Sequence, residues 1–179
     1  WVVCDNPVST ERIAGLGYDY VCVDGQHGIP ASSGWLAAMT AIDARGRSAG
    51  LVRVPVNDGT WIGFALDAGA RGVIVLVNSA DDAAAAVAAC RYPPRGVRSY
   101  GPTRSRLRVG PAPDVANDSV ACIVMIETAR ALDEIGAICA VDGLDGVYVG
   151  PSDLTIALGG RTSTDPSVAK EFDAALSTI

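Results

Sequence analysis

The sequence predicts an α/β fold, and more narrowly an incomplete (β/α)8 TIM barrel. Short apolar segments alternate along the 179 residues with segments of helical spacing, as in parallel sheets covered by helices. Several apolar segments are uniformly apolar, which is typical of strands buried on both faces. Two of them are followed closely by the carboxylates Glu127 and Asp153. Because parallel strands end at one edge of a sheet, the pattern predicts a site there.

The N-terminal half contains four expected βα units. We expect strands at residues 1–4, 20–23, 50–54 and 72–77, and helices that end near Gly15 or Gly17 and span residues 35–45, 61–68 and 81–91. Asn6, Asp58 and Ser79 offer helix N-caps, and glycine or proline follows each expected helix.

The C-terminal half contains two further expected units after a long polar segment at residues 97–119. That segment exceeds the usual length of an αβ connection, so it predicts a functional or mobile loop. Strands at 121–126 and 146–149 then alternate with helices at 129–139 and 165–177. An open doubly wound sheet is the alternative, but the first βα turn lacks the G-x-G-x-x-G phosphate-binding pattern.

About six βα units are therefore expected, whereas a complete barrel has eight strands and about 250 residues. We expect residues 1–179 to form a single (β/α) barrel domain, with C-terminal βα units missing from this chain. Six strands would leave two unpaired edges, which predicts low stability or assembly through those edges.

Composition argues for a small soluble substrate. A net charge of −6 and a pI near 4.6 argue against nucleic-acid or anionic-membrane partners. No apolar run approaches the roughly 18 residues of a membrane span. Five cysteines without C-x-x-C spacing indicate reduced thiols and a cytoplasmic location. A basic cluster fits either a solvated loop, a surface attracting anionic substrate or a subunit contact; its members are Arg95, Arg98, Arg104, Arg106 and Arg108.

His27 is the only histidine, and it follows an expected strand with Asp24 three residues before it. A histidine at a strand end is well placed to act as a general base. Asp24 would accept a hydrogen bond from one ring nitrogen and orient the imidazole. A loop histidine that only bonds to backbone is the alternative.

Arg53 stands in an otherwise apolar expected strand, where an unpaired cation is costly to bury. Two interpretations stay open. The guanidinium forms a structural ion pair with a strand-end carboxylate, or it binds a substrate carboxylate or developing enolate.

Glu127 and Asp153 together predict a metal site. Two carboxylates at one edge of the sheet supply hard oxygen ligands and leave positions for substrate and water, as expected for Mg²⁺ or Mn²⁺. Alone, Glu127 could favour the positive end of the following helix, and Asp153 could be an N-cap.

Six motifs in order along nearly the whole chain resemble the metal-dependent, pyruvate-type class II aldolases, namely the 2-dehydro-3-deoxyglucarate and 4-hydroxy-2-oxoheptanedioate aldolases. The motifs read GYDYVCVDGQHG (17–28), LVRVP (51–55), LDAGARG (66–72), RYPPRG (91–96), MIET (125–128) and VGPSDL (149–154).

The resemblance implies a carbon–carbon lyase on a (β/α)8 barrel that cleaves a 4-hydroxy-2-oxo acid reversibly to pyruvate and an aldehyde. It implies that Glu127 and Asp153 bind Mg²⁺ or Mn²⁺, with Co²⁺ as a further choice. By the same resemblance Arg53 contacts pyruvate, and His27 with Asp24 forms the base dyad. The amides of the turn Gly150, Pro151, Ser152 and Asp153 would hold the pyruvate carboxylate, and the protein would be a homo-oligomer, typically a hexamer.

Two residues depart from the family pattern, because Gln26 replaces a common glutamate and Met125 replaces a glutamine of some members. The rival interpretations are a CoA-ester lyase of the citrate lyase β-subunit type and a non-catalytic binding or assembly barrel. The Asp24–His27 and Pro-Pro-Arg-Gly motifs favour the aldolase over the first rival. The retained metal ligands count against the second.

Overall fold

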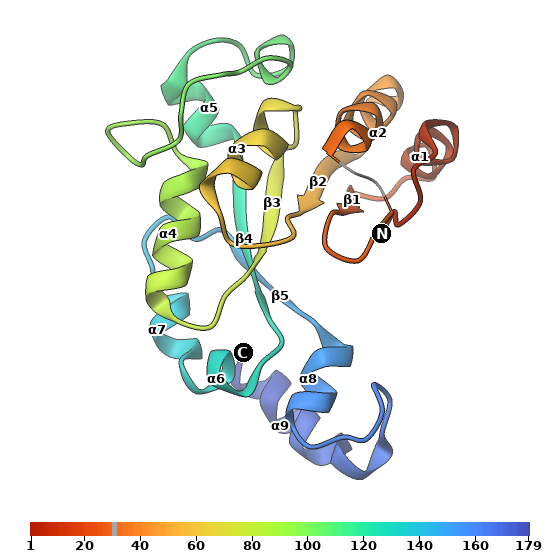
Figure 1. Cartoon of the computed structure of the whole chain (residues 1–179), viewed down its shortest axis with the longest axis vertical. Helices are drawn as coiled ribbons and strands as arrows, with labels where there is room; N and C mark the ends of the chain where they lie inside the picture. Colours follow the sequence, from red (N-terminus) through yellow and green to blue (C-terminus); the bar gives the residue numbers. More distant parts are fainter. Residues whose placement is uncertain (30–31) are drawn as a thin grey trace.

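The computed structural model describes residues 1–29 and 32–179. Within those residues the strands form one five-stranded parallel sheet in sequential order. They are β1 (Tyr20–Asp24), β2 (Ala49–Arg53), β3 (Gly72–Leu76), β4 (Ala121–Ile126) and β5 (Gly146–Val149). The sheet curls as part of a barrel wall, which confirms the predicted incomplete barrel (Figure 1).

The expected first strand differs from the prediction. Residues 1–4 contribute only an isolated bridge, in which Val2 pairs with Val23 beside β1. The backbone of Val2 donates to Cys22 and accepts from Asp24, at 2.8 and 2.9 Å. Asn6 then caps the first helix, so the chain turns away before a ladder can extend. Residues 1–4 therefore lie beside β1 at the edge of the sheet, but they do not form a sixth strand.

The main helices are α1 (Pro7–Ala14), α2 (Ser32–Arg45), α3 (Gly59–Asp67), α4 (Ala80–Cys90), α8 (Pro151–Ala157) and α9 (Ala169–Thr178). The helices before and between the strands cover the outer side of the sheet, whereas α8 and α9 follow β5 (Figure 1). Asn6, Asp58 and Ser79 accept hydrogen bonds from first-turn amides, so all three predicted N-caps are confirmed.

The C-terminal half contains short helices, and one break in an expected helix, that the sequence did not predict. The polar segment at 97–119 includes a 3-10 turn η1 (Ser105–Leu107) and the helix α5 (Pro113–Ser119). The helix expected at 129–139 is divided into α6 (Ala129–Asp133) and α7 (Ile135–Cys139), and a 3-10 turn η2 (Pro166–Val168) precedes α9. Their short lengths explain why periodicity did not resolve them.

Most arginines of the basic cluster form ion pairs with aspartates of other segments. Arg98 pairs with Asp67 at 2.6 Å and its guanidinium stacks on Tyr92 at 4.4 Å. Arg104 and Arg108 both reach Asp43 of α2, and Arg95 pairs with Asp118. These pairs attach residues 95–108 to the helices, so the cluster is mainly structural.

The main core lies between the sheet and the helices, and a smaller apolar layer fills the inner side. The inner layer contains Cys22, Leu51, Ile74 and Met125, one from each of β1 to β4. Side chains alternate between the two faces of a strand, so these four point to the inner face. All five cysteines lie in the described part of the chain as free thiols. Among the described residues, no helix is long and apolar enough to cross a membrane.

Candidate functional site

All the predicted site residues line one cavity of about 250 Å³ at the carboxyl ends of the strands. They are Asp24, His27, Arg53, Glu127, Gly150, Pro151, Ser152 and Asp153. Asp24 and Arg53 end β1 and β2, and Glu127 directly follows β4. Asp153 lies in the first turn of α8, after β5. The parallel sheet thus brings together residues separated by well over a hundred positions.

Asp24 and Arg53 are aligned partners in the β1–β2 register and form a two-contact ion pair. Arg53 donates from Nε to Oδ1 of Asp24 at 2.9 Å and from Nη2 to Oδ2. Burial acts to raise the pKa of Asp24, but hydrogen bonds from Arg53 and from backbone amides hold that pKa below its usual value. The ion pair that the sequence left open for Arg53 is therefore present.

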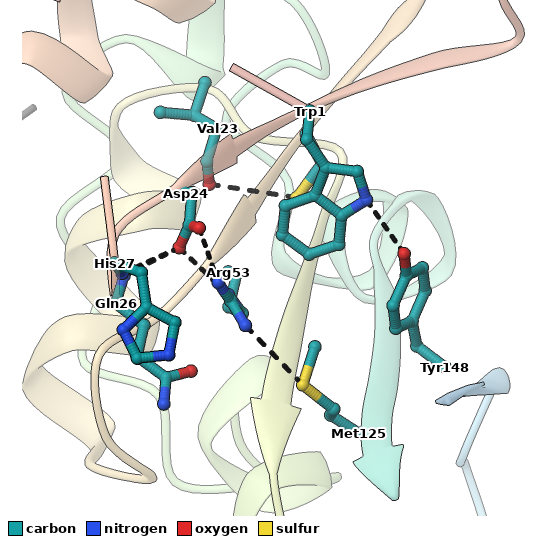
Figure 2. Close-up of polar contacts among 9 residues, drawn as sticks. Trp1, Val23, Asp24, Gln26, His27, Arg53, Met125 and Tyr148 are labelled. Atoms are coloured by element: carbon teal, nitrogen blue, oxygen red, sulfur yellow. Dashed lines mark hydrogen bonds and ion pairs between the residues drawn. The ribbon is translucent and has the colours of Figure 1, made fainter. Parts of the chain in front are cut away.

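The contact between Asp24 and His27 differs from the expected one. Oδ1 of Asp24 accepts from the backbone amides of Gln26 and His27, each at 3.0 Å, and not from the imidazole ring (Figure 2). The guanidinium of Arg53 donates to both oxygens of the same carboxylate. Asp24 therefore shapes the loop that carries His27, as aspartate does in tight turns.

Gly25 makes that loop fit against its neighbours. A Cβ at Gly25 would lie 2.4 Å from the Trp35 ring and 2.7 Å from the carbonyl oxygen of Arg53. Its amide donates to the same carbonyl at 2.8 Å. The close approach holds the start of the His27 loop against the end of β2.

The contacts of Arg53 with Asp24, Met125 and Trp1 leave one edge of its guanidinium available for other partners. Among residues 1–29 and 32–179, the single acceptor for Nη1 is the weak one, Sδ of Met125, at 3.8 Å. The ring of Trp1 covers the guanidinium face, with its centroid 4.9 Å from Cζ (Figure 2). Because Asp24 holds Nε and Nη2, the Nη1 group retains hydrogens for an anionic ligand.

Glu127 and Asp153 fit a divalent cation. Glu127 is only 6% exposed, and burial, followed by the charge of Asp153, raises its pKa. Neither carboxylate forms an ion pair or hydrogen bond with any side chain in the described ranges 1–29 and 32–179. Two adjacent unpaired carboxylates at a cavity wall favour a hard cation. No group of three or more histidine, cysteine, aspartate or glutamate side chains that could hold a metal ion occurs in the described part of the chain.

Gly150 provides the space for the Glu127 side chain. A Cβ on Gly150 would lie 2.2 Å from Oε2 of Glu127 and 2.8 Å from its Cβ. The Gly150 amide donates to the Ile126 carbonyl at 3.1 Å, so it is not free for a ligand. Pro151 has no N–H, which leaves the amides of Ser152 and Asp153 as the open donors of this turn.

Sequence reasoning missed two aromatic residues of the cavity. Nε1 of Trp1 donates to the hydroxyl of Tyr148 at 2.8 Å, and the rings meet edge to face at 5.2 Å (Figure 2). Tyr148 lies two residues before Gly150, so strand alternation alone would have placed both on the inner face. Trp1 carried no comparable signal, because it becomes a cavity residue only through the bridge at Val2.

Larger hollows elsewhere have no comparable chemistry. One of about 460 Å³ lies beside Trp1, Leu16 and Tyr20, and one of about 550 Å³ lies beside Phe64 and the paired Asp67 and Arg98. Only the 250 Å³ cavity, among those of the described residues, combines unpaired carboxylates with a histidine and an arginine.

Comparison with known proteins assigns a family. A family model described as HpcH/HpaI aldolase/citrate lyase matches residues 1–178. A 4-hydroxy-2-oxovalerate aldolase from Novosphingobium aromaticivorans is 41% identical over 171 residues, covering 92% of this chain and 65% of the relative. A 4-hydroxy-2-oxo-heptane-1,7-dioate aldolase from Salmonella arizonae is 40% identical over 164 residues, covering 89% of this chain and 62% of the relative.

Solved structures agree with this assignment. The crystal structure of an HpcH/HpaI aldolase/citrate lyase family protein from Burkholderia cenocepacia superposes with a TM-score of 0.85 at 32% identity. The match covers 99% of this chain and 73% of that protein. The chain spans less than two thirds of the length of the two curated relatives above.

Proposed function

The chain belongs to the HpcH/HpaI aldolase/citrate lyase family, and from this premise we propose that it is a divalent-metal-dependent aldolase. The reaction is reversible cleavage of a 4-hydroxy-2-oxo acid to pyruvate and an aldehyde. The observation that carries the proposal is the single cavity in which an unpaired Glu127–Asp153 pair faces Arg53 and His27. Both curated relatives named above are aldolases of 4-hydroxy-2-oxo acids.

Glu127 and Asp153 would hold Mg²⁺ or Mn²⁺, and Co²⁺ is a further choice for the same oxygen donors. When bound, the cation supplies Lewis-acid stabilisation of negative charge on the oxo acid. The unpaired state of both carboxylates and the space that Gly150 leaves for Glu127 support this assignment. The open amides of Ser152 and Asp153 would receive the substrate carboxylate at the turn that begins with Gly150 and Pro151.

His27 is the proposed base. In cleavage it removes the proton of the C4 hydroxyl, and the O–H electron pair forms the aldehyde carbonyl as the C3–C4 bond breaks. The C3–C4 pair forms the C2–C3 double bond, and the C2 carbonyl π pair moves to the oxygen to give the enolate of pyruvate. The aldehyde leaves, and the proton held by His27 balances the one that C3 takes up from solvent to complete pyruvate. The Asp24 carboxylate holds the backbone of the His27 loop, which supports a positioning role for Asp24 in place of ring orientation.

Arg53 is the proposed electrostatic partner of the enolate. Its Nη1 group is not engaged by Asp24, so it is available for the developing oxyanion. The pair with Asp24 fixes the guanidinium in one orientation, which avoids reorganisation when charge develops during cleavage.

The test is a coupled assay. Purified protein with a 4-hydroxy-2-oxo acid and Mg²⁺ or Mn²⁺ should release pyruvate, followed by a pyruvate-dependent dehydrogenase. EDTA should abolish the release, and added metal should restore it. No pyruvate above background, or release unaffected by EDTA, contradicts the proposal. Turnover of citryl-CoA or malyl-CoA in its place would support the CoA-ester lyase.

The base assignment has its own test. His27→Ala should lower kcat/KM by about a hundredfold or more while leaving metal binding intact, because a general base typically contributes 10²–10⁴. Titration of the variant with Mn²⁺ is the control. A His27→Ala variant that retains the full rate would refute the role.

We also propose a homo-oligomer, a hexamer by family resemblance, working in the cytoplasm. The free cysteines support a reducing compartment. Light scattering coupled to size-exclusion chromatography measures the assembly.

A further inference from the structure

We propose that Thr128 and Asn78 are positioning residues for metal binding, because their side chains together fix the backbone that carries Glu127. This inference rests on the proposed metal-dependent function and deepens the account of the same site. Thr128 is the last residue of the MIET motif (125–128) and directly follows the proposed ligand. Neither Thr128 nor Asn78 belongs to the described lining of the 250 Å³ cavity, so both would act through Glu127.

The hydroxyl of Thr128 makes two hydrogen bonds. Oγ1 donates to Oδ1 of Asn78 at 2.6 Å and accepts from the amide of Ala131 at 3.1 Å, which caps α6. The backbone of Thr128 is extended, with φ −123° and ψ 154°, so its side chain and that of Glu127 point to opposite sides of the chain. Holding the Thr128 side chain therefore fixes the direction in which Glu127 leaves the backbone.

The bond from Thr128 to Asn78 continues the attachment of β4 to β3 beyond their ladder. The two strands pair side by side as far as Leu76 and Met125 (Figure 1). The next backbone hydrogen bond, from the amide of Val77 to the carbonyl of Met125, is long at 3.4 Å. The short side-chain bond thus joins the two loops at the point where the backbone pairing weakens.

Asn78 is itself held in place, so it offers Thr128 a fixed acceptor. Its amide donates to Oδ2 of Asp82 at 2.9 Å, in the first turn of α4. The amide of Asp82 donates to Oγ of Ser79 at 3.2 Å, and Nδ2 of Asn57 donates to the Asp82 carbonyl at 2.9 Å. The loops that follow β2 and β3 therefore support the acceptor from behind.

Glu127 is confined from both neighbouring strands. On the β5 side, the amide of Gly150 donates to the carbonyl of Ile126 at 3.1 Å, and the missing Cβ of Gly150 leaves room for the Glu127 carboxylate. On the β3 side, the hydrogen bond between Thr128 and Asn78 fixes the following residue. A shift of this backbone would displace the Glu127 oxygens from the position in which they would share a cation with Asp153.

The first experiment measures Mn²⁺ affinity by isothermal titration calorimetry. Thr128→Val keeps the β-branched shape and removes the hydroxyl, and it should raise the Kd for Mn²⁺ about tenfold, as expected when a partner that orients a ligand is lost. Thr128→Ser keeps the hydroxyl and should bind Mn²⁺ as the unmodified protein does.

Two outcomes overturn the inference and leave the proposed metal site standing. One is an unchanged Kd in a folded Thr128→Val variant. The other is a Thr128→Ser variant as weak as Thr128→Val, because the hydroxyl would then not be the cause. Unmodified protein that binds no Mn²⁺ overturns both the inference and the proposed metal-dependent function.

The matched control for the lost helix cap is Asn6→Ala. Asn6 caps α1 by accepting from the amide of Ser9 at 2.9 Å, and it is not among the described residues that line the cavity. Asn6→Ala and Thr128→Val should lower the midpoint of urea unfolding by similar amounts, but only Thr128→Val should weaken Mn²⁺ binding. Equal losses of affinity would attribute the effect to general destabilisation and overturn the inference.

The second experiment tests whether the two residues act as a pair. Asn78→Ala should also raise the Kd for Mn²⁺, and the double variant with Thr128→Val should bind no more weakly than Thr128→Val alone, because both changes remove the same hydrogen bond. Losses that multiply in the double variant contradict the pairing. If Thr128→Val does not fold by circular dichroism, Asn78→Ala decides, and full Mn²⁺ affinity in that variant overturns the inference.

Discussion

At the scale of single residues, the site depends on which groups are already paired. Arg53 is held by Asp24 and covered by Trp1, whereas Glu127 and Asp153 have no cationic partner among the described residues. The paired arginine has a fixed orientation. Burial and the charge of Asp153 raise the pKa of Glu127, so the site would favour a cation that relieves this repulsion.

Gly150 gives a residue-scale prediction about the metal site. Gly150→Ala would place a methyl group 2.2 Å from Oε2 of Glu127, so the carboxylate must move from its position. We expect Mn²⁺ affinity to fall by at least about tenfold, in line with the effect of disturbing ligand orientation. Isothermal titration calorimetry measures it.

The matched control for that variant is Gly63→Ala in α3. An added Cβ at Gly63 has no heavy atom within 4 Å, so Mn²⁺ affinity should not change. The helix should gain roughly 0.5–1 kcal/mol from the replaced glycine. Unaltered metal affinity in Gly150→Ala would show that Glu127 does not depend on this space.

At the scale of elements, the polar segment after α4 is attached by specific side chains. Arg98 pairs with Asp67 at the end of α3, and Asn117 of α5 exchanges two hydrogen bonds with the Tyr92 backbone, at 2.7 and 3.1 Å. These contacts explain why a segment of loop-like composition is ordered against the helices. They also give Arg98, a member of the basic cluster, a structural role.

Arg98→Ala should destabilise the protein by about 3 kcal/mol, because it leaves the partly buried Asp67 without its partner. The free energy of unfolding in urea measures this. Arg95→Ala is the control, since its pair with Asp118 is largely exposed and should be worth less than about 1 kcal/mol. Equal losses in the two variants would mean that burial of the pair is not the cause.

At the scale of the whole molecule, curvature of the sheet brings its two ends together at the cavity. The hydrogen bond between Trp1 and Tyr148 joins residues 147 positions apart, from the bridge beside β1 and from β5. The proposed metal site similarly joins the end of β4 to the start of α8.

Metal binding should therefore raise the melting temperature. At a free Mn²⁺ concentration about a hundredfold above its Kd, binding adds about 2.7 kcal/mol of stability. For a chain of this length that corresponds to a shift of about 5–10 °C in a thermal unfolding scan. Asp153→Asn should show a much smaller shift. An equal shift in that variant would place the ion elsewhere.

The order of strands and the position of the site could be predicted from the sequence. Uniformly apolar runs such as residues 72–76 and 121–126 mark buried parallel strands, and the polar residues directly after them must share one edge. The first strand and α5 were not predicted correctly. An isolated bridge at Val2 and a seven-residue helix are too short for a periodic signal.

The sequence by itself therefore predicted the parallel α/β architecture and five polar residues at its edge, because apolar periodicity and parallel strand direction are local properties of the chain. The turn residues Gly150, Pro151 and Ser152 were added by the family resemblance. The tertiary structure alone decided how those residues are paired. It placed the Asp24 carboxylate on Arg53 and on the His27 backbone, and it brought Trp1 to Tyr148. Such contacts depend on the register between strands and on the curvature of the sheet, which many distant residues set together.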